Sequence, residues 1–506
     1  MTRSQIIKIL KAHHWKEEES KLSLHILDYW KTVHLQSRYV YRRELFTNST
    51  YAVFQGYGFE WVRVDETRAV LDWVFKKYKR DKDYFLKKDK EFEELSQTIK
   101  LLSDNVLKKG LNDFSNKKLI DLLNKANSLG KRMYGCSLIT EGADALTDED
   151  YQRLLSKVSK KDRPEVVRVL STAEEAGFIE KERLGLLKLA FEGKQNSGIL
   201  KSSSFFKKVK NHSRRYFWCH NSFYEAVFLD EAYFLKEIKR WLKESSVKGI
   251  QKKIKELENR RKETKAERQS LYKKYKLTEN AKLFFELVRY FLILQDRRKE
   301  NVQRLIFCVD AVLKQAAKRF GIGKETLNNY YFISEVLDLF ANGKKVRQIE
   351  FKRRKKAVSF SYIENNKIKT DWLLGKEADE VIEFFKQKKR HLKGSNVLCG
   401  FVASVGKGSK VIQGKVRIVI DPAKDIFHEG EILVTGMTRP EFVPLMRKAR
   451  AIITNEGGIT THAAIVSREL GVPCIIGTKI ATDILKSGDN VQLDLKDGTV
   501  KVLKGQ

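Results

Sequence analysis

Proline is almost absent from the first 393 residues of this 506-residue chain, and this absence strongly constrains how that part can fold. Only Pro164 lies before residue 394, whereas the other four prolines lie in residues 394–506. A proline inside a helix removes a backbone hydrogen bond and clashes with the preceding turn, so its absence permits long helices. Glycine is likewise concentrated in the last part, with 14 of 29 glycines in residues 394–506. We therefore expect two parts of different character that meet near residue 394.

Apolar periodicity predicts that residues 1–350 are mostly α-helical. Tyr151, Leu154, Leu155 and Val158, for example, recur with the i, i+3, i+4, i+7 spacing of one helix face. Charged residues dominate from about 248 to 277, which predicts a solvated helical arm.

A different pattern follows in residues 351–393. Apolar and polar residues alternate on both sides of Asn365 and Asn366, which predicts a β-hairpin. A helix and a basic linker are expected after the hairpin. We therefore divide the chain into residues 1–350, 351–393 and 394–506.

Short apolar strands alternate with helices in residues 394–506, which predicts a compact α/β domain. Strands are expected near residues 415–420, 431–435, 451–454, 474–476, 491–495 and 500–503. Helices are expected at residues 440–449 and 462–470, and Gly471 marks the end of the second helix. The predicted fold class is thus a mainly α-helical N-terminal part followed by a C-terminal α/β domain.

The chain is strongly basic, with 100 Lys+Arg against 65 Asp+Glu and a net charge of +35. Five scattered cysteines without a C-x-x-C pair exclude a disulfide framework and a zinc cluster. No apolar run is long enough to cross a membrane, and the N-terminus lacks the plan of a signal peptide, so a cytoplasmic protein is expected. Basic and aromatic residues alternate in residues 39–43 and 214–218, a pattern typical both of nucleic-acid surfaces and of grooves for phosphorylated ligands.

One segment carries recognisable chemistry. An apolar strand runs into Gly457 and Gly458, and His462 then opens a helix. The N-terminus of a helix offers unpaired N–H groups and a positive dipole end, which suit a phosphoryl group and favour neutral, nucleophilic imidazole. Thr460 and Thr461 add hydroxyl groups beside the ring. The segment predicts a histidine that accepts a phosphoryl group.

This segment resembles the phosphohistidine signature of phosphoenolpyruvate (PEP)-utilising enzymes, among them pyruvate phosphate dikinase, PEP synthase, enzyme I of the sugar phosphotransferase system and rifampicin phosphotransferase. The matching run is Gly457-Gly458-x-Thr460-x-His462-Ala463-Ala464-Ile465-Val466-Ser467-Arg468. Residues 394–506 as a whole resemble the swivelling mobile domain of that family.

The resemblance implies a role for each matching residue. His462 would be phosphorylated, and Thr460 and Arg468 would support the loop or the phosphate. Thr435 and Thr438 would lie on a neighbouring loop. Arg439 departs from the family, which often has an acidic residue there, and this change would affect docking rather than chemistry.

The resemblance also implies ATP or PEP as the phosphoryl donor, with Mg²⁺ at the donor site. The sequence shows neither the phosphate loops of an ATP-grasp domain nor a PEP-binding barrel, so we expect a separate nucleotide-binding or PEP-binding partner. No metal-ligating residues are expected in this chain. The helical part resembles the region that precedes the mobile domain in PEP-synthase-like and rifampicin-phosphotransferase-like proteins, which implies a small-molecule acceptor there. The residues that carry this second resemblance are Tyr216, Phe217, Trp218, Asn221, Asp296, Arg297, Arg298, Lys299 and residues 333–336.

Three functional hypotheses follow. In the first, His462 carries a phosphoryl group between a donor site and an acceptor that is bound by the helical part or by a partner. In the second, the chain is a non-catalytic regulator or adaptor, and in the third a basic nucleic-acid-binding protein, each with a relic mobile domain. The intact loop around His462 favours the first. A phosphate that is stable in base and labile in acid would support it, whereas binding with a steep salt dependence would support the third.

Overall fold

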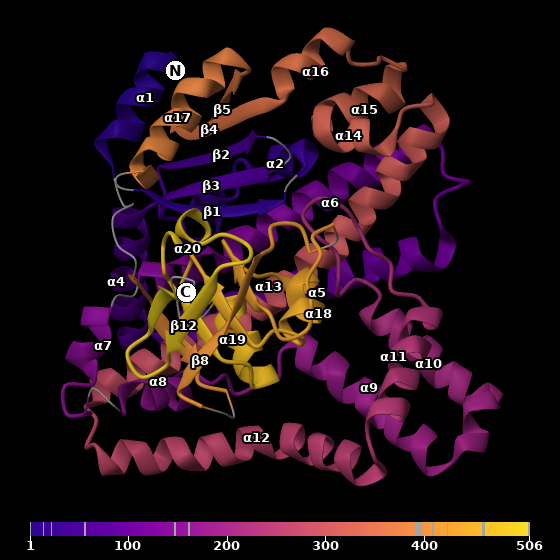
Figure 1. The fold of residues 1–506 in the computed structure, drawn as a ribbon. Helices are drawn as coiled ribbons and strands as arrows, with labels where there is room; N and C mark the ends of the chain where they lie inside the picture. The colour runs from indigo at the N-terminus through magenta and orange to yellow at the C-terminus, as the bar shows by residue number, and fades with distance from the viewer. Residues whose placement is uncertain are drawn as a thin grey trace.

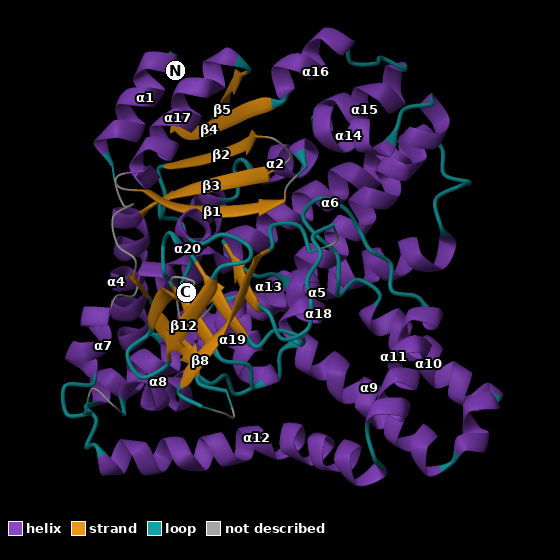
Figure 2. Cartoon of the chain, viewed as in Figure 1, coloured by secondary structure: helices purple, strands orange, loops and turns teal. Residues whose placement is uncertain are grey.

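The computed structural model describes residues 2–13, 15–21, 23–54, 57–145, 148–159, 162–390, 397–406, 409–422, 424–457 and 461–503. It contains an N-terminal helical part, residues 2–390, and a C-terminal domain, residues 397–503 (Figures 1 and 2). The predicted fold class is confirmed. The predicted linker near residue 393 lies largely outside the described residues.

Helices make up most of the N-terminal part. The α-helices are α1 Arg3–Ala12, α2 Leu24–Trp30, α3 Ser37–Tyr41, α4 Val64–Arg80, α5 Lys82–Lys109, α6 Asn116–Ser137, α7 Asp148–Leu154, α8 Arg163–Ser171, α9 Phe178–Gln195, α10 Ser203–Tyr216, α11 Glu231–Glu244, α12 Val247–Lys274, α13 Glu279–Phe320, α14 Lys324–Tyr330, α15 Ile333–Asn342, α16 Gln348–Arg354 and α17 Lys376–Arg390. Three 3₁₀ segments join them, η1 His34–Gln36, η2 Leu138–Ala145 and η3 Ser197–Lys201.

Helix α13 is the central element of this part. It runs for 42 residues, from the N-cap Thr278, whose hydroxyl accepts from the Ala281 N–H, to Gly321, whose φ of 60° ends the helix in the left-handed region. Its apolar side chains pack with those of α5 and α6 in one large core. Since no proline interrupts it, α13 extends across the molecule and passes behind the C-terminal domain in the view of Figure 1.

A five-stranded antiparallel sheet also belongs to this part, with the order β1-β3-β2-β4-β5. Its strands are β1 Trp15–Lys21, β2 Asn48–Phe54, β3 Tyr57–Arg63, β4 Lys356–Glu364 and β5 Lys367–Leu374. The predicted hairpin is present as β4 and β5. Because β4 pairs with β2, the hairpin shares one sheet with residues near the N-terminus. Strands β1, β2 and β3 were not predicted from the sequence.

The predicted charged arm is α12. Only Ile250, Ile254, Thr264 and Arg268 are buried along its 28 residues. The first two lie at the end that packs on α9, and Arg268 fastens the other end by donating to the Thr172 carbonyl oxygen at 2.7 Å. In Figure 1, α12 runs along the base of the molecule.

The C-terminal domain is built on an eight-stranded mixed sheet with the order β6-β13-β12-β8-β9-β10-β11-β7. Its strands are β6 Val397–Cys399, β7 Phe401–Ser404, β8 Val411–Ile418, β9 Ile432–Thr435, β10 Ala451–Thr454, β11 Cys474–Ile476, β12 Asn490–Asp494 and β13 Thr499–Leu503. Its helices are η4 Pro440–Phe442, α18 Val443–Met446, α19 His462–Leu470 and α20 Ala481–Ile484. All six predicted strands and both predicted helical segments are present, and β6 and β7 are additional.

The C-terminal domain is docked against the helical part. In Figure 1 the five-stranded sheet lies above it, α12 below it, and α9, α10 and α11 to its right. One apolar cluster joins Phe217 and Trp218 of the helical part with Leu433, Phe442 and Met446 of the C-terminal domain. Docking therefore buries apolar surface from both parts.

A second apolar contact lies on another side of the domain. The rings of Tyr151 and Phe401 stack with centroids 6.3 Å apart, and Ile465 of α19 packs against the same cluster.

Among the described residues, no helix combines the length and apolar character that crossing a bilayer requires.

Candidate functional site

The site lies at the carboxyl edge of four parallel strands, β8, β9, β10 and β11. Ligand sites of α/β sheets typically form there. The loop after β10 is tied to its neighbours by backbone hydrogen bonds: the Glu456 N–H donates to the Gly436 carbonyl, and the Gly477 N–H donates to the Glu456 carbonyl, both at 3.0 Å. The residue after Glu456 must be glycine, because a Cβ at Gly457 would lie 2.3 Å from the backbone of Gly477.

Helix α19 positions the histidine. Thr461 is its N-cap, and the Thr461 hydroxyl accepts from the Ala464 N–H at 3.5 Å. His462 is the first helical residue, and Ala463 and Ala464 follow it without crowding. The helix ends at Gly471, whose φ of 68° is left-handed. His462 thus sits at the positive end of the helix dipole.

The two ring nitrogens of His462 have different surroundings. Nδ1 lies 2.8 Å from the hydroxyl oxygen of Thr438, on the loop after β9. Nε2 is buried and has no hydrogen-bond partner within the described part of the chain. When Nδ1–H donates to Thr438, the lone pair is on Nε2, the nitrogen that is left unpaired.

Electrostatics keep this imidazole neutral. Only 8% of His462 is exposed, and burial lowers its pKa well below the usual 6.5. The positive charges of Lys299, on α13, and Arg439 lower the pKa further. A neutral ring is nucleophilic, and nearby cations would stabilise an anion attached to it.

Not every predicted site residue contacts the imidazole ring of His462. Thr438 does, and Thr461 caps the helix. The Thr435 hydroxyl is buried and donates to the Met437 carbonyl at 3.2 Å, so it braces the Thr438 loop. Arg468 donates from Nε to the Ala403 carbonyl at 2.7 Å, which fastens α19 to β7. Gly458 and Thr460 lie outside the described residues, and their roles stay predictions, as does a phosphate contact by Arg468.

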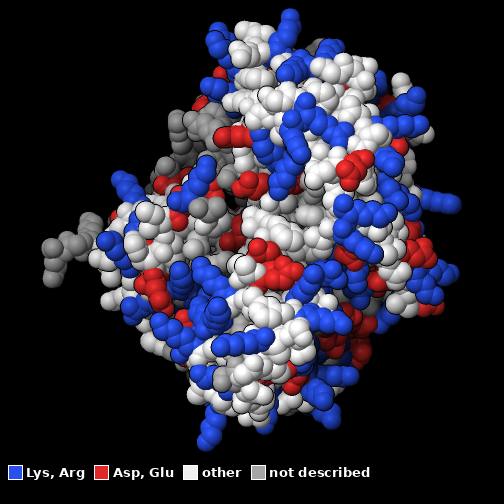
Figure 3. Space-filling view, turned by 90° about the vertical axis from the view of Figure 1, so that its right-hand side faces the viewer, with Lys and Arg blue, Asp and Glu red and all other residues white. Residues whose placement is uncertain are grey.

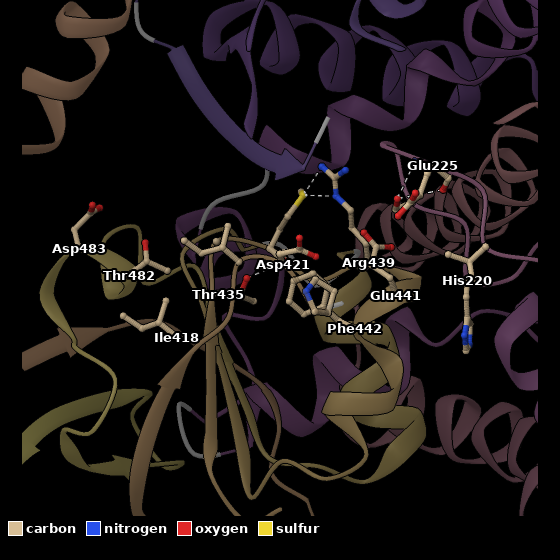
Figure 4. A pocket seen from close by; sticks show the side chains of 16 residues that line it. His220, Glu225, Ile418, Asp421, Thr435, Arg439, Glu441, Phe442, Thr482 and Asp483 are labelled. Atoms are coloured by element: carbon tan, nitrogen blue, oxygen red, sulfur yellow. Dashed lines mark hydrogen bonds between the residues drawn. The ribbon is translucent and has the colours of Figure 1, made fainter. Parts of the chain in front are cut away.

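A cavity of about 220 Å³ adjoins the Thr438 loop (Figure 4). The C-terminal domain contributes Thr435, Arg439, Glu441 and Phe442, and the helical part contributes His220 and Glu225 from the loop between α10 and α11, as Figure 4 shows. Asp421 and Asp483 also line the cavity. It therefore combines acidic groups, one guanidinium and an apolar wall, a lining suited to a small polar molecule.

Arg439 joins the two parts of the chain at this cavity. Its guanidinium lies 4.1 Å from the centroid of the Phe223 ring, a cation–π contact between the C-terminal domain and the helical part. It also lies 3.0 Å from the sulfur of Met437. Arg439 was predicted from the sequence to affect docking, whereas its partner Phe223 and the effect of Lys299 on His462 were not predicted. No local sequence pattern predicts these pairs. Only the tertiary fold places α13 and the α10–α11 loop beside residues of the C-terminal domain.

The described residues contain no group of three or more His, Cys, Asp or Glu side chains that could hold a metal ion. This donor set does not fit a resident Mg²⁺, and we assign no step of chemistry in this chain to one.

Comparison with known proteins identifies the C-terminal domain. The family model of the PEP-utilising enzyme mobile domain matches residues 427–498. The probable PEP synthase of Staphylothermus marinus is 43% identical over 151 residues, which cover 28% of this chain and 17% of that protein. The PEP synthase of Pyrococcus furiosus is 51% identical over 105 residues, 21% of this chain and 12% of that protein. The PEP synthase of Helicobacter pylori is 47% identical over 124 residues, 24% of this chain and 15% of that protein.

The chain thus spans less than a fifth of the length of each of these relatives. Among solved structures, a chain of Thermococcus kodakaraensis aconitase X (holo-form) matches 22% of this chain and all of that chain at 21% identity, with a TM-score of 0.18, too low to interpret. The sequence signature, the family match and the similar proteins all point to the C-terminal domain. The C-terminal domain of this chain belongs to the mobile domains of PEP-utilising enzymes.

Proposed function

We propose that this chain is a phosphotransfer protein and that His462 carries the phosphoryl group on Nε2. One observation supports this most directly: Nδ1 is hydrogen-bonded to Thr438, while Nε2 is buried, neutral and unpartnered within the described residues. A relic histidine would need neither a ring held by a hydrogen bond nor an unpaired nitrogen.

The chemistry follows from this geometry. The Nε2 lone pair attacks the donor phosphorus and forms the N–P bond, while the P–O bond to the leaving group breaks and its electron pair departs with the oxygen. Nδ1 keeps its proton, and the Thr438 oxygen accepts the hydrogen bond and stabilises the positive charge that develops on the ring. Lys299 and Arg439 then offset the charge of the phosphoryl group.

The donor belongs to another protein in this proposal. It would be ATP or PEP, with Mg²⁺, bound by a nucleotide-binding or PEP-binding partner in the cytoplasm. The relatives named PEP synthase support this class of donor. Because His462 is covered in the docked arrangement, the C-terminal domain has to leave the helical part to reach the donor.

The acceptor binds where the two parts meet. We place it in the cavity beside the Thr438 loop, because docking of the C-terminal domain completes that cavity with residues of both parts. A small hydroxyl-bearing molecule fits its volume and its hydrogen-bonding carboxylates.

The experiment is intact-mass measurement of the purified chain after incubation with ATP or PEP, Mg²⁺ and host lysate, with the samples kept alkaline. We expect a gain of one phosphoryl group in the wild type and in His428→Ala, a substitution of an exposed histidine of the same domain, but none in His462→Ala. A gain that survives in His462→Ala, or no gain with any donor, would overturn the proposal.

A further inference from the structure

A long groove separates α12 from the C-terminal domain. Its volume is about 980 Å³. One wall is α12 from Lys248 to Glu263, and the opposite wall is the end of β7 and the last turn of α19. Figure 1 shows α12 as a bar along the base of the molecule, below the C-terminal domain. Because Ile250 and Ile254 pack α12 onto α9 and Arg268 fastens the helix beyond the groove, α12 forms a fixed side of the groove.

Positive charge dominates the lining of this groove. The basic residues are Arg168, Arg183, Lys248, Lys252, Lys253, Lys255, Arg260 and Arg468, and the acidic residues are Glu165, Glu256, Glu263 and Glu469. Arg168 is satisfied locally, because its Nε donates to Glu165 at 2.8 Å. Burial raises the pKa of the Glu469 carboxyl, so Glu469 offsets little of the positive charge.

Five of these cations have no hydrogen bond or ion pair from their side chains within the described part of the chain: Arg183, Lys248, Lys252, Lys255 and Arg260. The Nε of Arg183 is buried without a partner. Burial and the neighbouring Arg447 lower the pKa of Arg183 to about 10. Like charges have thus been gathered in a concave site, where low-dielectric walls strengthen their field.

The shape and composition of the lining narrow the choice of ligand. None of the described lining residues is aromatic, so the groove offers no platform on which a nucleobase could stack. Lys248, Lys252 and Lys255 follow one another along one face of α12, and Arg260 lines the groove further along the helix, on a neighbouring face. From Lys248 to Arg260 the helix advances about 18 Å, so the cations suit an extended anion rather than a single one.

Positive charge by itself does not single out this groove. Figure 3 shows Lys and Arg spread over the whole of the face that it views. The groove differs in that it is concave and that five of its cations, Arg183, Lys248, Lys252, Lys255 and Arg260, have no side-chain partner among the described residues. We propose that it binds an extended phosphate chain of the inorganic polyphosphate type. This site is separate from His462, since it lies at the opposite end of α19, and it does not depend on phosphotransfer.

The test measures binding of fluorescently labelled linear polyphosphate to the full chain by fluorescence anisotropy at several salt concentrations. The groove variant carries Lys248→Glu, Lys252→Glu and Lys255→Glu, which are all exposed positions. The matched control carries Lys87→Glu, Lys90→Glu and Lys100→Glu on α5, which are equally exposed and change the net charge by the same amount. Thermal unfolding of each variant confirms that it is folded.

We expect the groove variant to bind polyphosphate roughly tenfold more weakly or worse, and the control to bind like the wild type. The slope of log K against log salt should fall by about 2 in the groove variant, because three phosphate contacts are lost. Equal weakening in both variants, or no binding by the wild type, would overturn the proposal. So would single-stranded RNA of equal charge that binds more tightly than polyphosphate and depends on the same three lysines, since the groove would then be a nucleic-acid site.

Discussion

At His462, the surroundings of the two ring nitrogens decide which of them can react. The Thr438 hydroxyl occupies Nδ1 and leaves Nε2 unpaired within the described residues. In the proposed mechanism Thr438 does not bind the phosphoryl group, and its role there is to position the ring. A positioning role of this kind can be separated from a structural one by substitution.

Replacing Thr438 by valine removes the hydroxyl and keeps the shape. We expect the rate of His462 phosphorylation to fall about tenfold, the value of one hydrogen bond of roughly 1.4 kcal/mol, because neither the ring orientation nor the tautomer is then held. Thr438→Ser keeps a hydroxyl and should restore most of the rate. The measurement is a time course of phosphohistidine formation by intact mass. Equal rates in all three proteins, with unchanged thermal stability, would show that Thr438 has no positioning role.

At the scale of elements, the predictions that succeeded rest on local signals. The helix at residues 462–470 has the predicted bounds, because Thr461 caps it and Gly471 ends it in the left-handed region. β10 and β11 likewise match their predicted apolar runs. By contrast β1 has the sequence WKEEESK, which carries no apolar alternation, and it is a strand because it pairs with β3. The predicted boundary near residue 394 stays a prediction.

The contacts that dock the C-terminal domain could not be predicted either, because they too depend on pairing between distant parts of the chain. Phe223 meets Arg439, and Tyr151 meets Phe401, across long separations in sequence. Each residue alone looks like any other aromatic or basic side chain. Their partners follow only from where the α10–α11 loop and α7 lie in the fold.

Phe223→Leu tests the docking contact, since it keeps an apolar side chain but removes the ring beneath Arg439. A cation–π contact is worth about 0.5–1 kcal/mol, so we expect the undocked state to become about two- to fivefold more populated. Hydrogen exchange of the α19 amides should accelerate accordingly. The control is Phe206→Leu on α10, whose side chain is 47% exposed. Exchange that is the same in both variants would mean that this contact does not hold the domain.

At the scale of the whole molecule, burial lowers the pKa of three of the described histidines. Burial lowers the pKa of His25 to about 3 and that of His220 to about 4, and it lowers the pKa of His462 well below 6.5. In the unfolded chain each would titrate near 6.5. The unfolded chain therefore binds protons that the folded protein excludes when the pH falls below 6.5, and folding stability must decrease over that range.

His220→Gln should remove one of these contributions. The free energy of unfolding of the wild type should fall more steeply than that of the variant between pH 6.5 and pH 4, with a total difference of about 3 kcal/mol from this one residue. Denaturant unfolding at several pH values measures both curves, and His428→Gln, at an exposed position, provides the control. Parallel curves for wild type and His220→Gln would contradict the buried, neutral state of His220.

The most direct test of the central claim is the position of the phosphoryl group on the protein. The chain is phosphorylated with the donor and lysate fraction that give a mass gain, kept alkaline, and examined by ³¹P–¹H correlation NMR together with peptide mapping. We expect one phosphoryl group, on Nε2 of His462, lost in acid and retained in base. A phosphoryl group on Nδ1, on another residue, or stable in acid would contradict the assignment of His462 Nε2 as the carrier.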